Sequence, residues 1–420
     1  MKWLLQLAAS SAWNRRFALS LVVLCIGLST FLLLAIERIR HDVRQNFAQS
    51  VSGTDLIVGA RTGSVQLLLY SVFRIGNATN NVRWSSIEAI SRHRAVAWVI
   101  PISLGDSHRG FPVIATSQAY FQHFRYGNRQ ALAMAQGARF DGVFEAVLGS
   151  EAARRLGYRL GQRIVLSHGD GVLEANDHAD KPFTVVGILA PTGTSVDRSV
   201  HISLAAMEAL HLDWMAGVPI PGMAVPAEQV GEHDLTPKSV TAALIGLKSR
   251  TAVFAVQRSI ADFEDEPLMA ILPGVALDEL WDVVGAGERG LMAMSALVGV
   301  VSLLGLVAVI MAGLNERRRE LSILRAIGAG PRQILLLLAA EGALVTVAGI
   351  VIGASACAFA ILLLGDWSQT QFGIALRLQP YGQQEWMLIG ILLGGGWLAS
   401  LLPGYRAYRL SLVDGLSPRI

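Results

Sequence analysis

Five polar residues that could bind a metal ion lie close together near the middle of the sequence. They are His168, Asp170, Asp177, His178 and Asp180. Imidazole nitrogens and carboxylate oxygens are ligands that zinc and copper ions accept. A polar loop of this kind is more often a solvated connection between strands than a metal site. We therefore keep the cluster as a candidate metal site but predict that it does not bind a metal ion tightly.

Catalytic motifs are missing from the rest of the sequence. The chain contains four lysines, and none of them follows a glycine, as the P-loop of a nucleotide-binding protein requires. The His-Glu-x-x-His motif of zinc peptidases and the Gly-x-Ser-x-Gly motif of hydrolases are also missing. We predict a non-catalytic chain that binds no cofactor of its own. Its basic residues form no long tract, which argues against nucleic-acid binding.

The composition indicates a membrane protein. Hydrophobic residues make up 52% of the 420 residues and charged residues only 16%, whereas charged residues make up about 25% of a typical soluble protein. Four apolar runs reach the length of about 20 residues that a helix needs to cross a bilayer. They cover residues 17–36, 291–314, 334–364 and 386–404. The sequence therefore predicts a polytopic α-helical membrane protein with four transmembrane helices.

The last two predicted spans contain features that bear on packing and transport. Gly349 and Gly353, like Gly390 and Gly394, are spaced so that two helices can pack closely, and packing within the chain is favoured over packing between chains. Glu341 falls within the third span, where a carboxylate is costly and often functional. A role in transport is one hypothesis for Glu341. A position near the membrane interface, or pairing within the bundle, is favoured.

The distribution of arginine and lysine predicts the orientation of the chain. Residues 1–16 carry three basic residues, the segment 315–333 carries five and the tail 405–420 carries three, whereas the loop 365–385 carries one. Cytoplasmic segments of membrane proteins are enriched in basic residues. We therefore predict that both termini and the segment 315–333 are cytoplasmic, and that the segment 37–290 and the loop 365–385 lie outside.

The segment 37–290 has the composition of a soluble domain. Its ends, 37–51 and 276–290, keep apolar residues at helical spacing and predict helices that continue the first and second spans outward. Between them, short apolar runs alternate with amphipathic stretches, which predicts an α/β domain. Strands are predicted at 55–58, 95–104, 111–116, 163–167, 183–189, 239–247 and 268–272, and helices at 85–92, 150–156 and 251–263. The apolar run 66–73 predicts a further buried strand, with an exposed hook as the alternative.

The segment 315–333 combines charge with an apolar stripe. Leu321, Leu324 and Ile327 fall on one face of a short predicted helix that also carries acids among its arginines. Arginines alone would suffice to anchor a cytoplasmic loop, so the stripe and the acids indicate a docking surface for another protein. The residues assigned to this surface are Glu316, Arg317, Arg318, Arg319, Glu320, Leu321, Leu324, Arg325, Ile327, Gly328 and Arg332.

This segment resembles the Arg-Arg-x-Glu-Leu/Ile-x-Ile-Leu-Arg-Ala-Ile/Leu-Gly-Ala signature of the MacB-like, FtsX-like family of ABC transporter permeases. The resemblance extends to the order of one helix, a large outer domain, three helices and a tail, and to Val185-Val186-Gly187-Ile188-Leu189 with the Pro-Thr-Gly-Thr stretch that follows. It implies a four-helix permease with a separate ATPase, and a MacB-like Porter part with an inserted subdomain. The chain departs from the fused MacB exporter, which carries its own ATPase, and from ten-helix members of the family.

The resemblance implies an organisation for the whole chain. The expected parts are the cytoplasmic N-terminus and first span (1–36), the stalk helices and periplasmic domain (37–290), the second span (291–314), a cytoplasmic coupling helix (315–333), the third span (334–364), a periplasmic loop (365–385), the fourth span (386–404) and a cytoplasmic tail (405–420).

The resemblance also implies a function and partners. The chain is expected in the inner membrane of a bacterium as one of two permeases, identical or different, with a dimer of cytoplasmic ABC ATPases docked on the coupling helix. ATP and Mg²⁺ would bind to the ATPase, and hydrolysis would drive a conformational change of the periplasmic domain. The expected outcome is export or extraction of an envelope molecule, such as a lipoprotein or a peptide, with a periplasmic adaptor or outer-membrane partner.

Two other functions stay open. An FtsX-like regulator would activate a periplasmic cell-wall hydrolase without moving a substrate, although the outer segment is larger than is usual for such regulators. A membrane-anchored periplasmic metal-handling protein is suggested only by the cluster of histidines and aspartates.

The predicted topology can be tested by chemical labelling. We predict that a cysteine introduced near Asp106 reacts with a membrane-impermeant maleimide in intact cells, and that one near Ser322 reacts only after the cells are permeabilised. The reason is that the arginine distribution assigns the two positions to opposite sides of the membrane. Labelling of both cysteines from outside would contradict this topology.

Overall fold

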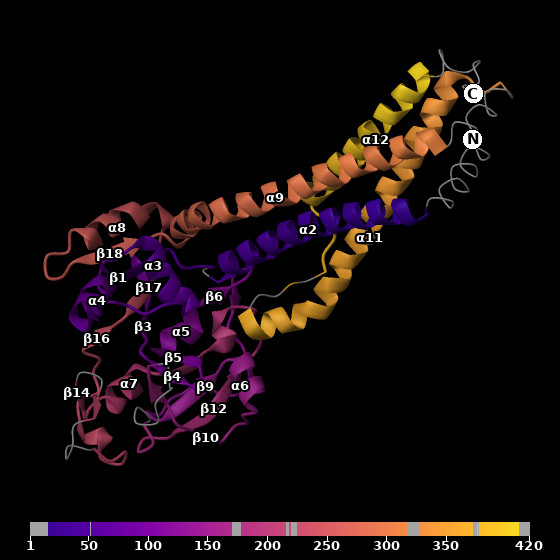
Figure 1. Ribbon diagram of the computed structural model, residues 1–420. Coiled ribbons are helices and arrows are strands. Elements are labelled where there is room, and N and C mark those ends of the chain that lie inside the picture. The colour runs from indigo at the N-terminus through magenta and orange to yellow at the C-terminus, as the bar shows by residue number, and fades with distance from the viewer. Residues whose placement is uncertain are drawn as a thin grey trace. The chain divides into compact units, whose positions relative to one another are not determined.

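The computed structural model describes residues 16–50, 52–169, 178–215, 218–219, 225–316, 328–372, 376 and 378–410 (Figure 1). The chain divides into two compact units. The helical unit comprises the described parts of residues 1–42, 284–367 and 376–420. The α/β domain comprises those of residues 43–283, together with the segment 368–375.

Among the described residues, four helices are long and apolar enough to cross a membrane. They are α2 (Arg16–Gln49), α9 (Pro273–Glu316), α11 (Pro331–Phe372) and α12 (Gln383–Leu410). Each apolar run predicted from the sequence falls within one of them, so the four-span architecture is confirmed. Helix α11 extends beyond residue 365, where a loop was predicted, because residues 366–372 include no glycine or proline that would end it.

Glycines let α2 and α11 approach each other closely in the helical unit. A Cβ atom added at Gly353 would lie 2.3 Å from the carbonyl oxygen of Gly27. One added at Gly349 would lie 2.7 Å from Cβ of Ile26. No larger side chain fits at either position, so this glycine pair serves packing within the chain, as predicted.

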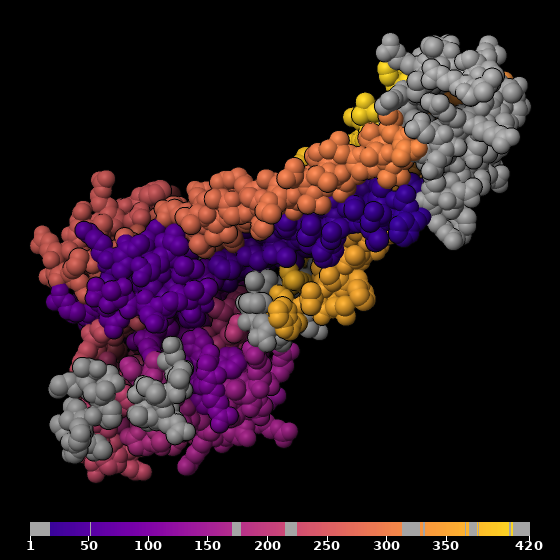
Figure 2. All heavy atoms as spheres, viewed as in Figure 1, coloured from indigo at the N-terminus to yellow at the C-terminus, as the bar shows by residue number. Residues whose placement is uncertain are grey.

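Other glycines of the bundle differ in how closely a neighbouring helix approaches them. Helix α9 lies along α2 in Figure 2, and a Cβ atom added at Gly299 would lie 3.0 Å from Oγ of Ser29. By contrast, Cβ atoms added at Gly390 and Gly394 would meet no atom within 4 Å in the described part of the chain. Within the described residues, the second glycine pair therefore makes no close helix contact, contrary to the prediction.

The α/β domain is built on one mixed sheet. The strands on its main path are β1 (Leu56–Ala60), β3 (Val96–Ser103), β5 (Phe111–Thr116), β9 (Glu145–Leu148), β10 (Arg163–Ile164), β12 (Phe183–Leu189), β13 (Val200–Ser203), β17 (Ala242–Leu247) and β18 (Leu268–Ile271). Their spatial order is β10-β12-β9-β13-β5-β3-β17-β1-β18. Two neighbouring pairs, β9 with β12 and β5 with β13, are parallel, and the other neighbours on this path are antiparallel.

The sheet is buried on both faces. Leu56 and Val58 of β1 pack in one hydrophobic cluster, whereas Ile57 packs in a second cluster on the opposite face. Strands with two buried faces read as continuous apolar runs, and for this reason every predicted strand except the run 66–73 overlaps an observed one.

Helices cover both faces of the sheet. The first cluster includes residues of α4 (Trp84–Ser91), α6 (Ser150–Leu156), α7 (Leu204–Leu210) and α8 (Val253–Ala261). The second includes residues of α3 (Ser64–Leu68), the π-helical turn η1 (Leu69–Phe73), α5 (Gln118–His123) and the first turn of α9. The domain thus has a helix–sheet–helix arrangement, and the prediction of an α/β domain is confirmed.

The run 66–73 is helical, so the prediction of a strand was wrong. Its residues belong to α3 and η1, and Leu67, Leu68 and Tyr70 are buried in the second cluster. The prediction that the run is buried was right, and the alternative of an exposed hook was wrong. A short, continuous apolar run has no period that distinguishes a helix from a strand.

The segment 134–189 is inserted in the sequence between the parallel neighbours β5 and β13. It contains β9 and β12, and it joins the sheet through the antiparallel pairing of β9 with β13. This insert extends the main sheet, and the inserted subdomain that the resemblance implied stays a prediction. The sequence analysis predicted neither β9 nor β13, each of which has only four residues.

Candidate functional site

The segment assigned to docking is described only at its edges. Glu316 is the last residue of α9, and Arg332 is the second residue of α11. Gly328 has a φ angle of +99°, a conformation that favours glycine and is common where helices end. Residues 317–327, which carry the arginines and the apolar stripe, lie outside the described residues. The docking surface therefore stays a prediction.

Glu341 lies inside the bundle of the helical unit. Its exposed fraction is 2%, and it has an interaction partner. The next residue, Gly342, packs tightly against α12, because a Cβ atom added there would lie 2.3 Å from Cβ of Ser400. Glu341 is thus buried in the bundle, while its position relative to the membrane interface and a role in transport stay predictions.

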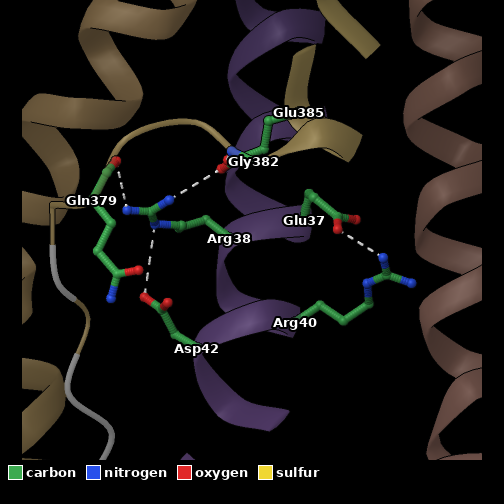
Figure 3. Close-up of polar contacts among 7 residues, drawn as sticks. All are labelled: Glu37, Arg38, Arg40, Asp42, Gln379, Gly382 and Glu385. Atoms are coloured by element: carbon green, nitrogen blue, oxygen red, sulfur yellow. Dashed lines mark hydrogen bonds and ion pairs between the residues drawn. The ribbon is translucent and has the colours of Figure 1, made fainter. Parts of the chain in front are cut away.

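Arg38 is the centre of a buried polar network in the helical unit (Figure 3). Its Nη1 atom lies 3.3 Å from Oε1 of Glu385 in α12, and its Nη2 atom donates a 2.9 Å hydrogen bond to the carbonyl oxygen of Gln379. Its Nε atom lies 3.8 Å from Oδ2 of Asp42, one turn further along α2. Arg38, Asp42 and Glu385 are each at most 5% exposed, so the network is shielded from solvent.

Glu385 also stabilises the start of α12. Its Oε2 atom accepts a 2.6 Å hydrogen bond from the backbone nitrogen of Gly382, the residue before the helix begins. A glutamate at the third helical position that reaches back to this amide satisfies one of the donors that a helix start leaves free. The same carboxylate therefore caps α12 and pairs with α2.

A second polar contact joins the same two helices. Nη2 of Arg40 lies 2.7 Å from Oε1 of Glu37 and 2.6 Å from Oε1 of Gln384. The sequence analysis predicted neither the Arg38–Glu385 contact nor the Arg40–Gln384 contact. The residues of these two pairs are 347 and 344 positions apart in the sequence. The one signal that could have pointed to them is the occurrence of charges directly beside two predicted spans.

The α/β domain brings two of the predicted metal-ligand candidates together with two residues that the sequence analysis missed. His168 and His178 lie beside Asp106 and His211, and one potential ligand atom from each lies within 4.8 Å of the others. We call these four residues the Asp106 cluster. Asp106 and His211 are 62 and 43 positions from His168, so local spacing gave no signal for them.

The remaining candidates of the sequence analysis do not join this cluster in the described structure. Oδ2 of Asp180 lies 3.1 Å from Nζ of Lys181, with which it forms an ion pair. Asp170 and Asp177 lie outside the described residues.

Strand pairing and a helix end position the Asp106 cluster. Asp106 begins β4 (Asp106–His108), and it lies opposite His168 of β11 (Ser167–His168) in an antiparallel register. His211 is the first residue after α7. His178 packs against Trp214, with ring centroids 4.4 Å apart.

The ring nitrogens of two histidines converge on one carboxylate oxygen. Nδ1 of His168 lies 3.0 Å from Oδ1 of Asp106. Nε2 of His211 lies 3.6 Å from the same oxygen and 3.3 Å from Nδ1 of His168. Such a group of nitrogen and oxygen atoms can hold either shared protons or a metal ion.

The surroundings shift the pKa values of the cluster in different directions. Burial alone would raise the pKa of Asp106, but hydrogen bonds from His168 and His211 and the nearby imidazoles lower it to about 2. Burial lowers the pKa of His178 to about 4. Burial also acts to lower the pKa of His211, but the hydrogen bond to Asp106 and its charge raise it overall. The cluster thus contains an ionised carboxylate and a neutral His178 at neutral pH.

Comparison with known protein families gives two matches. Residues 17–262 match the family described as MacB-like periplasmic core domain, and residues 292–412 match the family described as FtsX-like permease C-terminal. The first match covers more than half of the chain. Among curated protein sequences, none matches.

Solved structures include similar chains. One is the periplasmic region of MacB from Actinobacillus actinomycetemcomitans, with 11% identity, a TM-score of 0.33, and coverage of 56% of this chain and 95% of that one. Another is the extracellular domain of the noncanonic ABC-type transporter YknZ from Gram-positive bacteria. Its identity is 11% and its TM-score 0.29, with coverage of 52% of this chain and 98% of that one.

The Arg38 network leads to a prediction about stability. We expect Arg38→Met to destabilise the protein strongly, because it leaves the buried carboxylates of Glu385 and Asp42 without this cation, a change that typically costs about 3–5 kcal/mol. Arg92→Met is the control, since the side chains of Arg92 and its partner Glu88 are 78% and 47% exposed and exposed pairs contribute about 0–1 kcal/mol. The measurement is the unfolding temperature of the purified protein in detergent.

A double variant separates lost charge pairing from lost packing. Adding Glu385→Gln to Arg38→Met removes one of the stranded charges and should recover part of the lost stability. Equal unfolding temperatures for Arg38→Met and Arg92→Met would contradict a structural role for the buried pair of Arg38 and Glu385.

Proposed function

Because the chain belongs to the MacB/FtsX-type family of ABC transporter permeases, we propose that it is the membrane subunit of a complex in which ATP hydrolysis moves the α/β domain. In this proposal the complex lies in the bacterial inner membrane, with both termini and the segment 315–333 in the cytoplasm and the α/β domain in the periplasm. Permeases of this family are generally non-catalytic, so ATP and Mg²⁺ would bind to a separate ATPase dimer.

The observation that carries this proposal is the continuity of α2 and α9. Helix α2 has 34 residues and α9 has 44, which correspond to about 51 Å and 66 Å of helix. The hydrocarbon core of a bilayer is only about 30 Å thick. Each helix contains an apolar span in the helical unit and continues without a break into residues of the α/β domain. An unbroken helix can carry a displacement along its axis.

The parts of both helices that belong to the α/β domain pack into its core. Ala276 and Leu277 of α9 are 1% and 5% exposed and belong to the second hydrophobic cluster. Phe47 of α2 stacks on Phe73 of η1 with ring centroids 4.2 Å apart, and it contacts Trp281 of α9 at 5.6 Å. A displacement of either helix would therefore act directly on the core of the domain.

The partners follow from the same proposal. The ATPase dimer would dock on residues 316–332, where the apolar stripe gives affinity and the charges fix orientation. A second permease chain, identical or different, would complete the complex. Purification of the complex would identify both partners.

Export or extraction of an envelope molecule, such as a lipoprotein or a peptide, is the function that a movable periplasmic domain of this size would serve best. A periplasmic adaptor or an outer-membrane protein would then receive that molecule. Metal handling is the second candidate function, and the observation that favours it is the Asp106 cluster.

The docking surface leads to one prediction. We expect Leu324→Asp combined with Glu320→Arg to abolish co-purification of the ATPase and its stimulated ATP hydrolysis in nanodiscs. A charge buried in an apolar contact costs on the order of 2 kcal/mol or more, which weakens binding at least roughly thirtyfold. Membrane insertion should persist, because it depends on the flanking apolar spans.

A charge placed beside the stripe serves as the control. Ser322→Asp adds the same charge two residues away and off the line of Leu321, Leu324 and Ile327, so it should leave co-purification intact. If the double variant and Ser322→Asp both bind and stimulate the ATPase normally, the segment only anchors the topology.

The continuity of α2 leads to another prediction. We expect Gln45→Pro, at an exposed position between the span and Phe47, to uncouple ATP hydrolysis from the α/β domain. Proline removes a backbone hydrogen bond and clashes with the preceding turn, at a cost of about 3 kcal/mol. The measurement is the ATP-dependent change in hydrogen exchange of the α/β domain in the reconstituted complex. Gln45→Ala keeps the helix and is the control.

The Gln45→Pro variant should distinguish transmission of the motion to the α/β domain from assembly of the complex. In Gln45→Pro the ATPase should still co-purify and hydrolyse ATP, while the exchange response seen in Gln45→Ala is lost. Helix α2 is better suited to this test than α9, because α9 contains Gly285 and Gly287 in the corresponding stretch. An unchanged response in Gln45→Pro would contradict transmission through α2.

A further inference from the structure

We propose that the Asp106 cluster, formed by Asp106, His168, His178 and His211, binds one divalent transition-metal ion and that zinc fits best. This proposal concerns the α/β domain and does not depend on coupling to an ATPase. It replaces the expectation of a solvated loop, because Asp106 and His211 complete a ligand set that a single loop does not supply.

The hydrogen bond of His211 determines which of its nitrogens can bind a metal. Nδ1 lies 2.8 Å from the carbonyl oxygen of Met207, and a carbonyl oxygen only accepts, so Nδ1 carries the hydrogen. In the neutral ring, Nε2 then directs a lone pair toward the Asp106 carboxylate, 3.6 Å away. Two converging lone pairs need a cation between them, which is either a proton on Nε2 or a metal ion. Histidines that bind metals commonly donate their other nitrogen to a carbonyl in this way.

Other buried atoms of the cluster also need a partner. The side chain of His178 is 0% exposed, and neither ring nitrogen has a hydrogen-bond partner among the described residues. Within the same part of the chain, Oδ2 of Asp106 is buried without a partner as well. Buried polar atoms in folded proteins are almost always satisfied. A metal ion at the centre of the cluster would satisfy a nitrogen of His178 and the carboxylate together.

The spacing of the ligand atoms matches tetrahedral coordination. With bonds of about 2.0–2.1 Å, two ligands of a tetrahedral zinc ion lie roughly 3.3 Å apart. The three distances among Asp106, His168 and His211 are 3.0, 3.3 and 3.6 Å. These three atoms therefore form one face of a tetrahedron, and His178, within 4.8 Å of each, supplies the fourth ligand.

The surrounding backbone and an ion pair hold the ligands in place. The backbone nitrogen of His178 donates a 2.8 Å hydrogen bond to the carbonyl oxygen of Leu166, two residues before His168. Lys181, which is 0% exposed, donates a 2.8 Å hydrogen bond to Oδ1 of Asp213. This contact ties the turn that follows His178 to the turn that follows His211. Such supporting contacts are what a preorganised site requires.

The ligand types and their exposure indicate which ions can bind. Three imidazoles and one carboxylate suit zinc, copper(II), nickel or cobalt, whereas magnesium and calcium prefer oxygen ligands. Four protein ligands around one ion are typical of closed zinc sites. The side chains of His168 and His211 are 34% and 27% exposed, so an ion can enter from solvent.

A proton is the competing occupant. If Nε2 of His211 is protonated, it donates to the Asp106 carboxylate, and the cluster is an ordinary buried ion pair. This alternative predicts no specific metal binding, so measurement of binding separates the two.

The test uses the full chain in detergent, purified with a tag that contains no histidine and freed of metal with a chelator. Zinc is titrated in competition with a chromophoric chelator, and cobalt(II) is titrated while its absorption is recorded. We expect one zinc ion per chain with a dissociation constant of micromolar or below. We also expect the intense visible absorption of tetrahedral cobalt.

Variants locate the ion. Loss of an outer-shell partner alone typically weakens metal binding by about 10–100-fold, so His168→Ala and His211→Ala, which each remove a ligand, should weaken zinc binding at least as much. Asp106→Asn, which keeps the shape of the side chain, should weaken it as well. His233→Ala removes an exposed histidine of the same domain and should change nothing.

Three results would overturn the proposal. They are the absence of zinc binding, zinc binding by His168→Ala and His211→Ala that equals that of His233→Ala, and an octahedral cobalt spectrum. The cobalt spectrum is recorded on the unchanged chain, so it decides the matter even if a ligand variant fails to fold.

Discussion

Helix α2 contains a membrane span and a segment packed in a protein core within one unbroken helix. The rest of the structure depends on this constraint. A helix can cross a bilayer because it satisfies its own backbone hydrogen bonds. Helix α2 keeps this pairing beyond its apolar run, through Arg38 and Asp42 to Phe47. Charges appear where the apolar run ends, and the helical unit buries them.

Burial of charge at this point is stable only because each charge meets a partner. Arg38 lies between Glu385 and Asp42, and Arg40 pairs with Glu37. Uncharged groups in the spans are satisfied locally, since Thr30 and Ser302 each donate a 2.8 Å hydrogen bond to the carbonyl oxygen four residues earlier. Sliding of α2 along α12 would break the pair of Arg38 with Glu385, at a cost of about 3–5 kcal/mol. The two helices should therefore move together.

The sequence allowed most elements to be predicted, but not the contacts between distant elements. The spans follow from length and hydropathy, and strands such as β5 and β12 follow from continuous apolar runs. The run 66–73 failed because it has no period. Strands β9 and β13 were missed because each has only four residues and these include polar ones. Arg38 with Glu385, and Asp106 with His168, are single residues brought together by packing and by strand register. Nothing in their local sequence selects one partner among many charged residues.

The Asp106 cluster links segments that the chain order keeps apart. Asp106 precedes the insert 134–189, His168 and His178 lie within it, and His211 follows β13 and α7. An ion that binds only the folded form stabilises it by about 2.7 kcal/mol at a concentration 100 times its dissociation constant. That energy would hold the insert to the part of the sheet that continues to β1 and β18. The first turn of α9 packs on that sheet. A metal-bound domain would therefore move as one body when α9 is displaced. Without the metal ion, the insert would be free to move relative to the rest of the sheet.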